Sequence, residues 1–300
     1  MEQHLREVVV IARESSKNGI QYYRRLMDEL PKRDVKIVEA HVVRSRKELK
    51  KHIRQAVEAK RSYVVVVGGD GTQTAAVAEL AHTETVMCVV PAGTGNSFAL
   101  GLGIPHDVEK AIDAIASGKE IRVDVGCING TPFANFATVG VLALAADRTP
   151  KPLKRIIGPL AYAVGFLPVM RRKPFHLRAT YDGGDVAVET HQAILAAGRY
   201  YGWKPLTPDA DVRSGELAFF SSEGRTVADV IKTNAALVFG SQTNLAGSHF
   251  FSSKKIKIEC KPKQPINLDG HLYGKKTPAT FEVLKRALRV LVPQDFEDNA

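Results

Sequence analysis

The chain contains few cysteines and lacks a long apolar run, and each of these features excludes a class of protein. Its 300 residues include three cysteines, Cys88, Cys127 and Cys260, which are far apart and match no metal-site spacing. An odd number of distant cysteines argues against a disulfide framework and favours a reducing, cytoplasmic setting. The longest apolar run, residues 139–146, is far shorter than the roughly 20 residues that a membrane-spanning helix requires. The sequence therefore predicts a chain that does not cross a membrane.

Acidic residues are outnumbered by basic ones. The chain has 42 Lys and Arg against 32 Asp and Glu, a net charge of +10. Such a surplus favours anionic partners, namely nucleotides, nucleic acid or acidic lipid surfaces, although a basic charge that only confers solubility explains it equally well. With 44% hydrophobic and 25% charged residues, the chain has the composition of a soluble globular protein of one large or two modest domains.

The first third of the chain alternates between strand and helix patterns. Strands are predicted at residues 8–12, 35–39, 63–67 and 86–90, and helices at residues 15–30, 47–60, 74–82, 97–102 and 108–117. This alternation is typical of an α/β domain with a parallel sheet covered on both sides. Ligands of such sheets lie beyond the carboxyl ends of the strands.

The pattern changes near residue 121. Further strands are predicted at residues 121–128, 131–138, 176–181, 186–197, 216–221, 255–259 and 280–284, separated by turn signals such as Asn129-Gly130 and Asp269-Gly270. We therefore expect an α/β domain over residues 1–121 and a mostly antiparallel β domain over residues 122–284. The apolar stretch at residues 287–292 predicts that residues 285–300 return to the first sheet.

Two glycine-rich loops follow predicted strands. Gly68-Gly69-Asp70-Gly71-Thr72 ends one run of valines, and Pro91-Ala92-Gly93-Thr94-Gly95-Asn96 ends a second. Such loops expose backbone N–H groups with no Cβ in the way, which is what a nucleotide phosphate needs. Asp70 can hold a metal ion and Thr72 can donate to a phosphate, but a plain glycine turn with Asp70 capping the next helix is the simpler alternative. Neither the Walker pattern nor the dinucleotide fingerprint is present.

The two loops, with Gly101-Leu102-Gly103-Ile104-Pro105 after the second, resemble the catalytic domain of the diacylglycerol kinase family. That family includes sphingosine, ceramide and bacterial lipid kinases, and it shares the first loop with NAD kinases. The resemblance extends from the first loop to about residue 272, through segments at residues 124–126, 133–140, 158–162, 198–202, 208–210 and 268–270.

The resemblance implies an ATP-dependent transfer of phosphate to a lipid hydroxyl. It implies that ATP is held by Gly68, Gly69, Asp70, Gly71, Thr72, Gly93, Thr94, Gly95 and Asn96. It also implies that Asp70 and Asp124 belong to a network of water and Mg²⁺, and that Asp269 deprotonates the acceptor. His271 can orient Asp269 or relay its proton. Without the resemblance, Asp269 and His271 are interpreted as turn residues.

Several carboxylates of the family pattern are missing here. Ala75, Ser97 and His271 stand where the family has acidic residues, and Arg213-Ser214 replaces an Asp-Asp pair that holds a structural magnesium ion in bacterial relatives. Fewer carboxylates hold a divalent cation less tightly, so we expect that structural magnesium site to be absent. The losses leave a second hypothesis open, a catalytically reduced member that binds nucleotide or lipid without efficient turnover. A third hypothesis is an NAD kinase, but the second-loop pattern of that class differs from residues 91–96.

The expected partner is a lipid alcohol at a membrane surface. Residues 151–173 carry basic residues at both ends of an apolar helical pattern, which is typical of a helix on an anionic membrane, although a linker helix packed on the core is the more ordinary interpretation. We expect a cytoplasmic protein with peripheral membrane contact and without a nucleic-acid partner. The sequence does not decide between a monomer and a homodimer.

Overall fold

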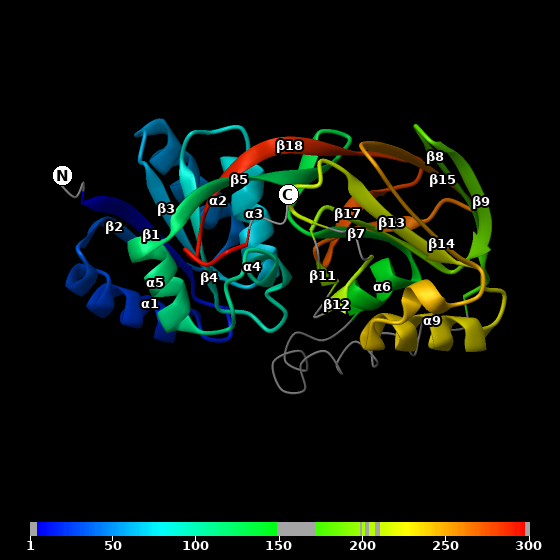
Figure 1. The fold of residues 1–300 in the computed structure, drawn as a ribbon, viewed down its shortest axis with the longest axis horizontal. Coiled ribbons are helices and arrows are strands. Elements are labelled where there is room, and N and C mark those ends of the chain that lie inside the picture. Colours follow the sequence, from blue (N-terminus) through cyan, green and yellow to red (C-terminus); the bar gives the residue numbers. More distant parts are fainter. Residues whose placement is uncertain (1–4, 149–171, 199, 202–203, 208–210, 298–300) are drawn as a thin grey trace. The chain divides into compact units, whose positions relative to one another are not determined.

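The computed structural model describes residues 5–148, 172–198, 200–201, 204–207 and 211–297 (Figure 1). The chain divides into two compact units, unit 1 with Met1–Asp124 and Lys285–Ala300, and unit 2 with Val125–Leu284. The basic segment predicted at residues 151–173 lies, up to residue 171, outside the described residues. Across the described part of the chain, no helix combines the length and apolarity that crossing a membrane requires.

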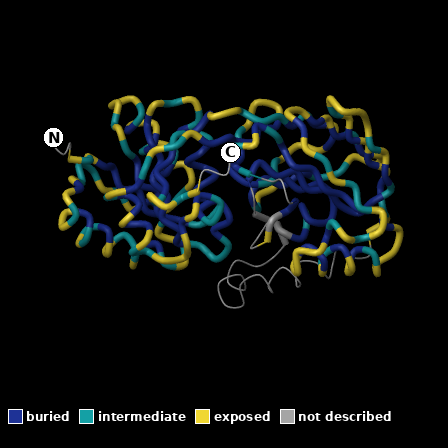
Figure 2. Tube along the Cα trace, viewed as in Figure 1, coloured by how far each residue is buried: buried dark blue, intermediate teal, exposed yellow. Residues whose placement is uncertain are grey.

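Unit 1 is built on a parallel sheet, which confirms the predicted α/β class. The strand order is β2 (Val35–Val43), β1 (Arg6–Arg13), β3 (Tyr63–Gly68), β4 (Val86–Pro91) and β18 (Ala279–Val292), and β5 (Lys119–Ile128) pairs with β18. The valine-rich centres of β1, β3 and β4 are fully buried, as the dark blue trace in Figure 2 shows. Strands that are apolar on both faces are those of a sheet covered on both sides.

Five helices accompany this sheet, α1 (Gly19–Glu29), α2 (Arg46–Glu58), α3 (Asp70–Leu80), α4 (Ser97–Gly101) and α5 (Val108–Ser117), with a 3₁₀ turn η1 (Pro31–Arg33). Helix α5 has the predicted bounds. Helix α3 begins at Asp70, four residues before the predicted start at Thr74. The Gly69 carbonyl accepts hydrogen bonds from the N–H groups of Thr72 and Gln73 at 2.8 and 3.0 Å, so the glycine loop itself forms the first helical turn.

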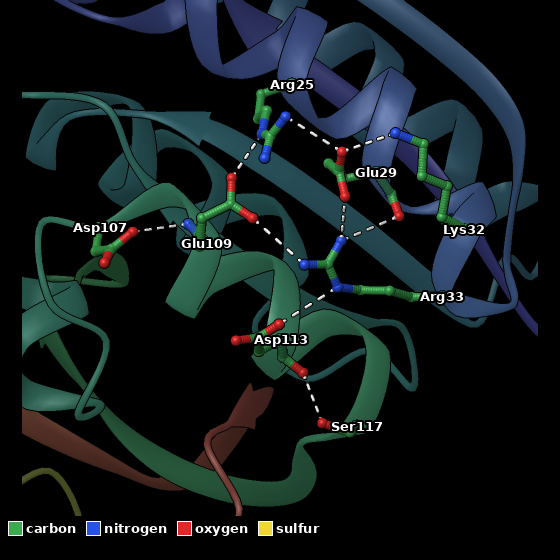
Figure 3. A network of polar contacts seen from close by, with 8 residues as sticks. All are labelled: Arg25, Glu29, Lys32, Arg33, Asp107, Glu109, Asp113 and Ser117. Carbon is green, nitrogen blue, oxygen red and sulfur yellow. Dashed lines mark hydrogen bonds and ion pairs between the residues drawn. The ribbon is translucent and has the colours of Figure 1, made fainter.

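An ion-pair network joins α1 and η1 to α5 (Figure 3). Arg25 Nε lies 2.6 Å from Glu109 Oε1, and Arg33 reaches Glu29, Glu109 and Asp113 at 2.6, 3.3 and 3.4 Å. The charged side chains of this network bridge α1 and η1 to α5 and so orient these helices relative to one another.

Unit 2 contains two antiparallel sheets, which confirms the predicted β-rich class. One consists of β9 (Gly184–Thr190), β8 (Phe175–Tyr181), β15 (Lys255–Lys261) and the first part of β18. The other has the order β14 (Ser248–Ser253), β13 (Leu217–Ser222), β10 (Gln192–Ala196), β7 (Phe136–Gly140), β16 (Pro265–Leu268) and β17 (His271–Lys276). Both sheets contribute to one hydrophobic core. Two short pairs complete the unit: β11 (Tyr200–Tyr201) with β12 (Lys204–Pro205), and β6 (Thr131–Phe133) with β5.

Helices pack on the second sheet of unit 2. Helix α6 (Val141–Arg148) and helix α9 (Val227–Phe239) contribute Leu142 and Leu237 to a cluster with Ile194 and Phe220 of the sheet, and η3 (Gln242–Asn244) follows α9. Neither α9 nor β14 was predicted.

Two predicted strands are wrong because each is two strands. The predicted strand 131–138 divides into β6 and β7, since the N–H groups of Ala134, Asn135 and Phe136 point to a carboxylate instead of a neighbouring strand. The predicted strand 186–197 divides at His191, where the chain leaves β9 of one sheet and enters β10 of the other. Conversely, the predicted stretches 280–284 and 287–292 form the single strand β18.

Candidate functional site

The two glycine loops meet backbone to backbone beyond the carboxyl ends of β3 and β4. A Cβ on Gly69 would lie 2.9 Å from the Gly93 Cα, and a Cβ on Gly93 would lie 2.4 Å from the Gly69 Cα. Ala92 N–H donates to the Gly68 carbonyl at 3.0 Å, which extends the pairing of the two strands into the loops. No side chain fits between these backbones, so only glycine at both positions allows the loops to form one surface.

Asn96 fixes the shape of the second loop. Its Oδ1 accepts a hydrogen bond from Gly93 N–H at 2.9 Å and its Nδ2 donates to the Gly93 carbonyl at 3.1 Å. The residue has φ +53°, in the left-handed region that asparagine tolerates better than most residues. Because one side chain holds both polar groups of Gly93, the Gly93–Asn96 turn is closed without a contribution from the first loop.

Asp70 connects the two loops. Its Oδ2 accepts a hydrogen bond from Asn96 N–H at 2.7 Å, and its Oδ1 lies 3.5 Å from Phe98 N, at the start of α4. Burial raises the pKa of the Asp70 carboxyl, and the backbone donors at Asn96, Phe98 and Ser97 oppose that rise. Asp70 therefore caps a helix, as the simpler interpretation of the sequence allows, but the helix is α4 and not its own helix α3.

The two carboxylates expected near magnesium both accept backbone hydrogen bonds. Asp124 Oδ1 accepts from Arg286 N–H at 2.7 Å, and Asp70 is bound as described above. Within the described ranges, no three His, Cys, Asp or Glu side chains gather as a metal site. Carboxylates that already accept backbone hydrogen bonds suit contact with Mg²⁺ through water better than direct ligation.

The remaining predicted loop residues form the rim of this surface. Gly71, Gly93, Thr94 and Gly95 are partly exposed, whereas Thr72 is buried. The Thr72 side chain folds back over Gly68, since a Cβ on Gly68 would lie 2.4 Å from the Thr72 Cβ. Thr72 thus packs beneath the loop, and the exposed polar groups at the rim are mainly backbone.

The sequence did not predict three residues that contact the loops. The buried Gln73 donates from Nε2 to the carbonyls of Val66 and Gly68 at 3.1 and 3.2 Å. His106 Nε2 lies 2.9 Å from the Gly95 carbonyl, and Asn18 N–H donates to the Ala92 carbonyl at 3.2 Å. A polar side chain directly after a glycine loop is the one signal that pointed to Gln73; no local pattern marks the other two.

Asp269, the expected general base, lies in unit 2 and is buried in a turn between β16 and β17. Its Oδ2 accepts a hydrogen bond from Ala134 N–H at 2.8 Å, and its Oδ1 accepts from Asn135 and Phe136 N–H at 3.0 and 2.9 Å. Asp269 itself has φ +46°. Hydrogen bonds from three N–H donors favour the ionised form of this carboxylate.

The neighbours of Asp269 differ in exposure. His271 is the first residue of β17, is exposed, and lies opposite Leu268 in the strand pair. The replaced magnesium segment forms a turn in which Arg213 N–H donates to Asp211 Oδ1 at 2.9 Å. Residues 208–210, which belong to the same family segment, lie outside the described residues.

Two domain-family models match successive parts of the chain. The model of the diacylglycerol kinase catalytic domain matches residues 7–128, and the model of the YegS C-terminal NAD kinase beta sandwich-like domain matches residues 135–292. A diacylglycerol kinase of Staphylococcus aureus strain bovine RF122 is 31% identical over 245 residues, which is 80% of this chain and 78% of that protein. The chain belongs to the diacylglycerol kinase family. A diacylglycerol kinase of Staphylococcus saprophyticus is 29% identical over 249 residues, 82% of this chain and 81% of the relative.

Solved structures share the fold of this family member. A crystal structure of a diacylglycerol kinase from Bacillus anthracis matches with a TM-score of 0.77 at 19% identity, over 99% of this chain and 100% of that one. Another structure from the same organism has a TM-score of 0.84 at 20% identity, over 99% and 98% of the two chains. The chain therefore has the fold of these two solved structures in addition to its family membership.

Proposed function

We propose that this protein is an ATP-dependent lipid kinase that transfers the γ-phosphate to the hydroxyl group of diacylglycerol or a related lipid alcohol. The observation that carries the proposal is the contact between Gly69 and Gly93, which brings two sets of backbone N–H groups to one surface. The names of the curated relatives support the lipid class.

The phosphates of ATP bind to this surface through backbone groups. Helix α3 begins inside the first loop, and the N-terminus of a helix offers backbone N–H groups and partial positive charge. Helix N-termini after glycine loops bind phosphate for these two reasons. The partly exposed Gly93–Gly95 segment completes the contact. Asp70 and Asp124 would hold, through water, the Mg²⁺ that accompanies ATP and neutralises phosphate charge.

Asp269 is the general base of the proposed reaction. Its carboxylate accepts three backbone hydrogen bonds, which favour the ionised form that a general base needs to accept the proton of the lipid hydroxyl as the oxygen attacks phosphorus. His271 assists by orienting Asp269 or by relaying the proton.

Transfer of labelled phosphate from ATP to lipid alcohols in mixed micelles tests the proposal. Gly93→Ala places a Cβ 2.4 Å from the Gly69 Cα and should reduce kcat/KM by at least ~100-fold, because the N–H groups no longer converge. Gly130→Ala is the matched control: it has φ +82° and open space around it, so it strains a turn in unit 2 without touching the loops. Asp269→Asn should lower kcat and leave ATP affinity unchanged.

The assay also distinguishes an active lipid kinase from a family member that binds nucleotide or lipid without efficient turnover. ATP binding that Gly93→Ala abolishes, without transfer to any lipid above the Asp269→Asn background, would favour a binding protein and overturn the kinase proposal. Equal transfer by the wild type and Gly93→Ala would contradict the role of the paired loops.

A further inference from the structure

Helix α9 presents an apolar face to solvent. Val227, Ile231, Val238 and Phe239 are 39, 52, 69 and 76% exposed. Val227, Ile231 and Val238 are spaced by four and seven residues, so they lie on one side of the helix, with the exposed Ala235 between them. We call Val227, Ile231, Ala235, Val238 and Phe239 the α9 outer face. The opposite side, including Val230 and Leu237, is buried.

The helix that carries this face is firmly held. Thr226 and Asp229 form a capping box at its start, and Gly240 ends it in the left-handed conformation. Ser222 Oγ and Thr233 Oγ1 lie 2.8 Å apart and connect it to β13. Exposure of the α9 outer face therefore follows from the packing of α9 on the sheet and not from a loose helix end.

Two more exposed apolar residues lie on the same side of the sheet as α9. Phe250 of β14 is 49% exposed and lies opposite Phe220, which packs with Leu237 of α9. Leu272 of β17 is 42% exposed and lies opposite Asn267, whose side chain reaches α6. Eight large apolar residues are exposed in the described chain, and six of them belong to this one side of unit 2. A concentration of this kind marks an interaction surface.

The charge of unit 2 indicates what this surface contacts. Residues 125–284 contain 20 Lys and Arg against 12 Asp and Glu, so unit 2 carries eight of the ten surplus positive charges. Lys232 is exposed beside Ile231, and the Lys204 side chain lies against Gly240 at the end of α9. Asp229, the one acidic residue of α9, is occupied by its capping box. An apolar face with cationic side chains beside it fits an anionic bilayer.

We infer that the α9 outer face, with Phe250 and Leu272, docks unit 2 on the surface of an anionic phospholipid membrane. The inference rests on the proposed function, since a kinase for a membrane-resident alcohol must reach its substrate at the bilayer. It places the contact on α9, within the described residues, in addition to the segment at residues 151–173. The helix lies in the interface plane, with its apolar side chains among the acyl chains and Lys232 at the headgroups.

Co-sedimentation with vesicles tests the inference. The triple variant Ile231→Ser, Val238→Ser and Phe239→Ser should bind phosphatidylglycerol-containing vesicles at least ~10-fold more weakly, because it removes three side chains that bury apolar area. Val42→Ser, at a residue 42% exposed in β2 of unit 1, is the matched control and should bind like the wild type. Lys232→Glu should weaken binding to phosphatidylglycerol vesicles more than to neutral ones.

Wild-type binding by the triple variant would overturn the inference. A wild-type dimer that the triple variant converts to monomers, with vesicle binding unchanged, would assign the face to a contact between copies instead. A short-chain diacylglycerol dissolved as monomers separates the two proposals. The triple variant should phosphorylate it at the wild-type rate and lose rate only on vesicles, whereas failure of the kinase proposal leaves the wild type inactive on both substrates.

Discussion

At the scale of single residues, Asn96 gives the proposed phosphate-binding surface its shape. One side chain holds both the N–H and the carbonyl of Gly93, and the backbone N–H of the same residue binds Asp70. The second loop therefore keeps its turn and its contact with the first loop through one asparagine. We therefore expect Asn96 to be more important for nucleotide binding than its position at the end of the motif suggests.

Asn96→Ala should weaken ATP binding roughly 10- to 100-fold. The substitution leaves both groups of Gly93 without their partner, which costs about 1–3 kcal/mol, and it places alanine at a positive φ. Isothermal titration calorimetry with ATP measures the change. Asn129→Ala is the matched control, since Asn129 also has positive φ and a side chain that accepts a backbone hydrogen bond, from Thr280 at 3.2 Å in unit 2. Equal loss of affinity in both variants would contradict the role given to Asn96.

The sequence predicted the residues of the loops but not their hydrogen bonds. Glycine, asparagine and aspartate after two valine runs are visible locally, and the parallel sheet predicts that the loops are neighbours. The contacts of Gln73 and His106 depend on how β3, β4 and the chain after α4 pack together. Such contacts join residues from separate elements, so no single stretch of sequence contains them.

At the scale of elements, the strands of unit 1 were predictable and α9 was not. Fully buried parallel strands appear as valine runs, whose type is clear even when their ends are not. Helix α9 has apolar residues on both its buried and its exposed sides, so the amphipathic periodicity that reveals a helix is lost. The feature that hid the helix from the sequence is the feature that we interpret as a membrane contact.

The network between α1 and α5 gives a pH prediction. Hydrogen bonds from Lys32 and Arg33, with the nearby charge of Arg25, lower the pKa of Glu29 from 4.5 to about 2. Because the folded value lies below the unfolded one, the stabilisation is fully present above pH 4.5 and is lost as the pH falls toward 2.

Urea unfolding of the wild type and Glu29→Gln at several pH values measures this effect. The variant should unfold at lower urea near neutral pH, and the difference in midpoint should shrink steadily below pH 4.5. Glu58→Gln, at the exposed end of α2, should follow the wild type throughout. A difference between wild type and Glu29→Gln that does not change with pH would contradict the ion-pair origin.

At the scale of the whole molecule, the proposed roles are divided between the two units. Unit 1 holds the glycine loops, Asp70 and Asp124, while unit 2 holds Asp269 and the α9 outer face. The surplus positive charge belongs mainly to unit 2. This division separates binding of the soluble nucleotide from contact with the lipid, and it predicts that each can be disturbed without the other.

The binding of ATP phosphates by the paired glycine loops is the central claim, and amide resonances of isotope-labelled protein test it most directly. On titration with ATP, the backbone N–H signals of Gly69, Gly71, Gly93 and Gly95 should shift first and furthest, while those of the α9 outer face stay in place. Saturation at one ATP per chain with shifts confined to unit 1 is the predicted result. Large shifts elsewhere, with the four glycine signals unmoved, would contradict it.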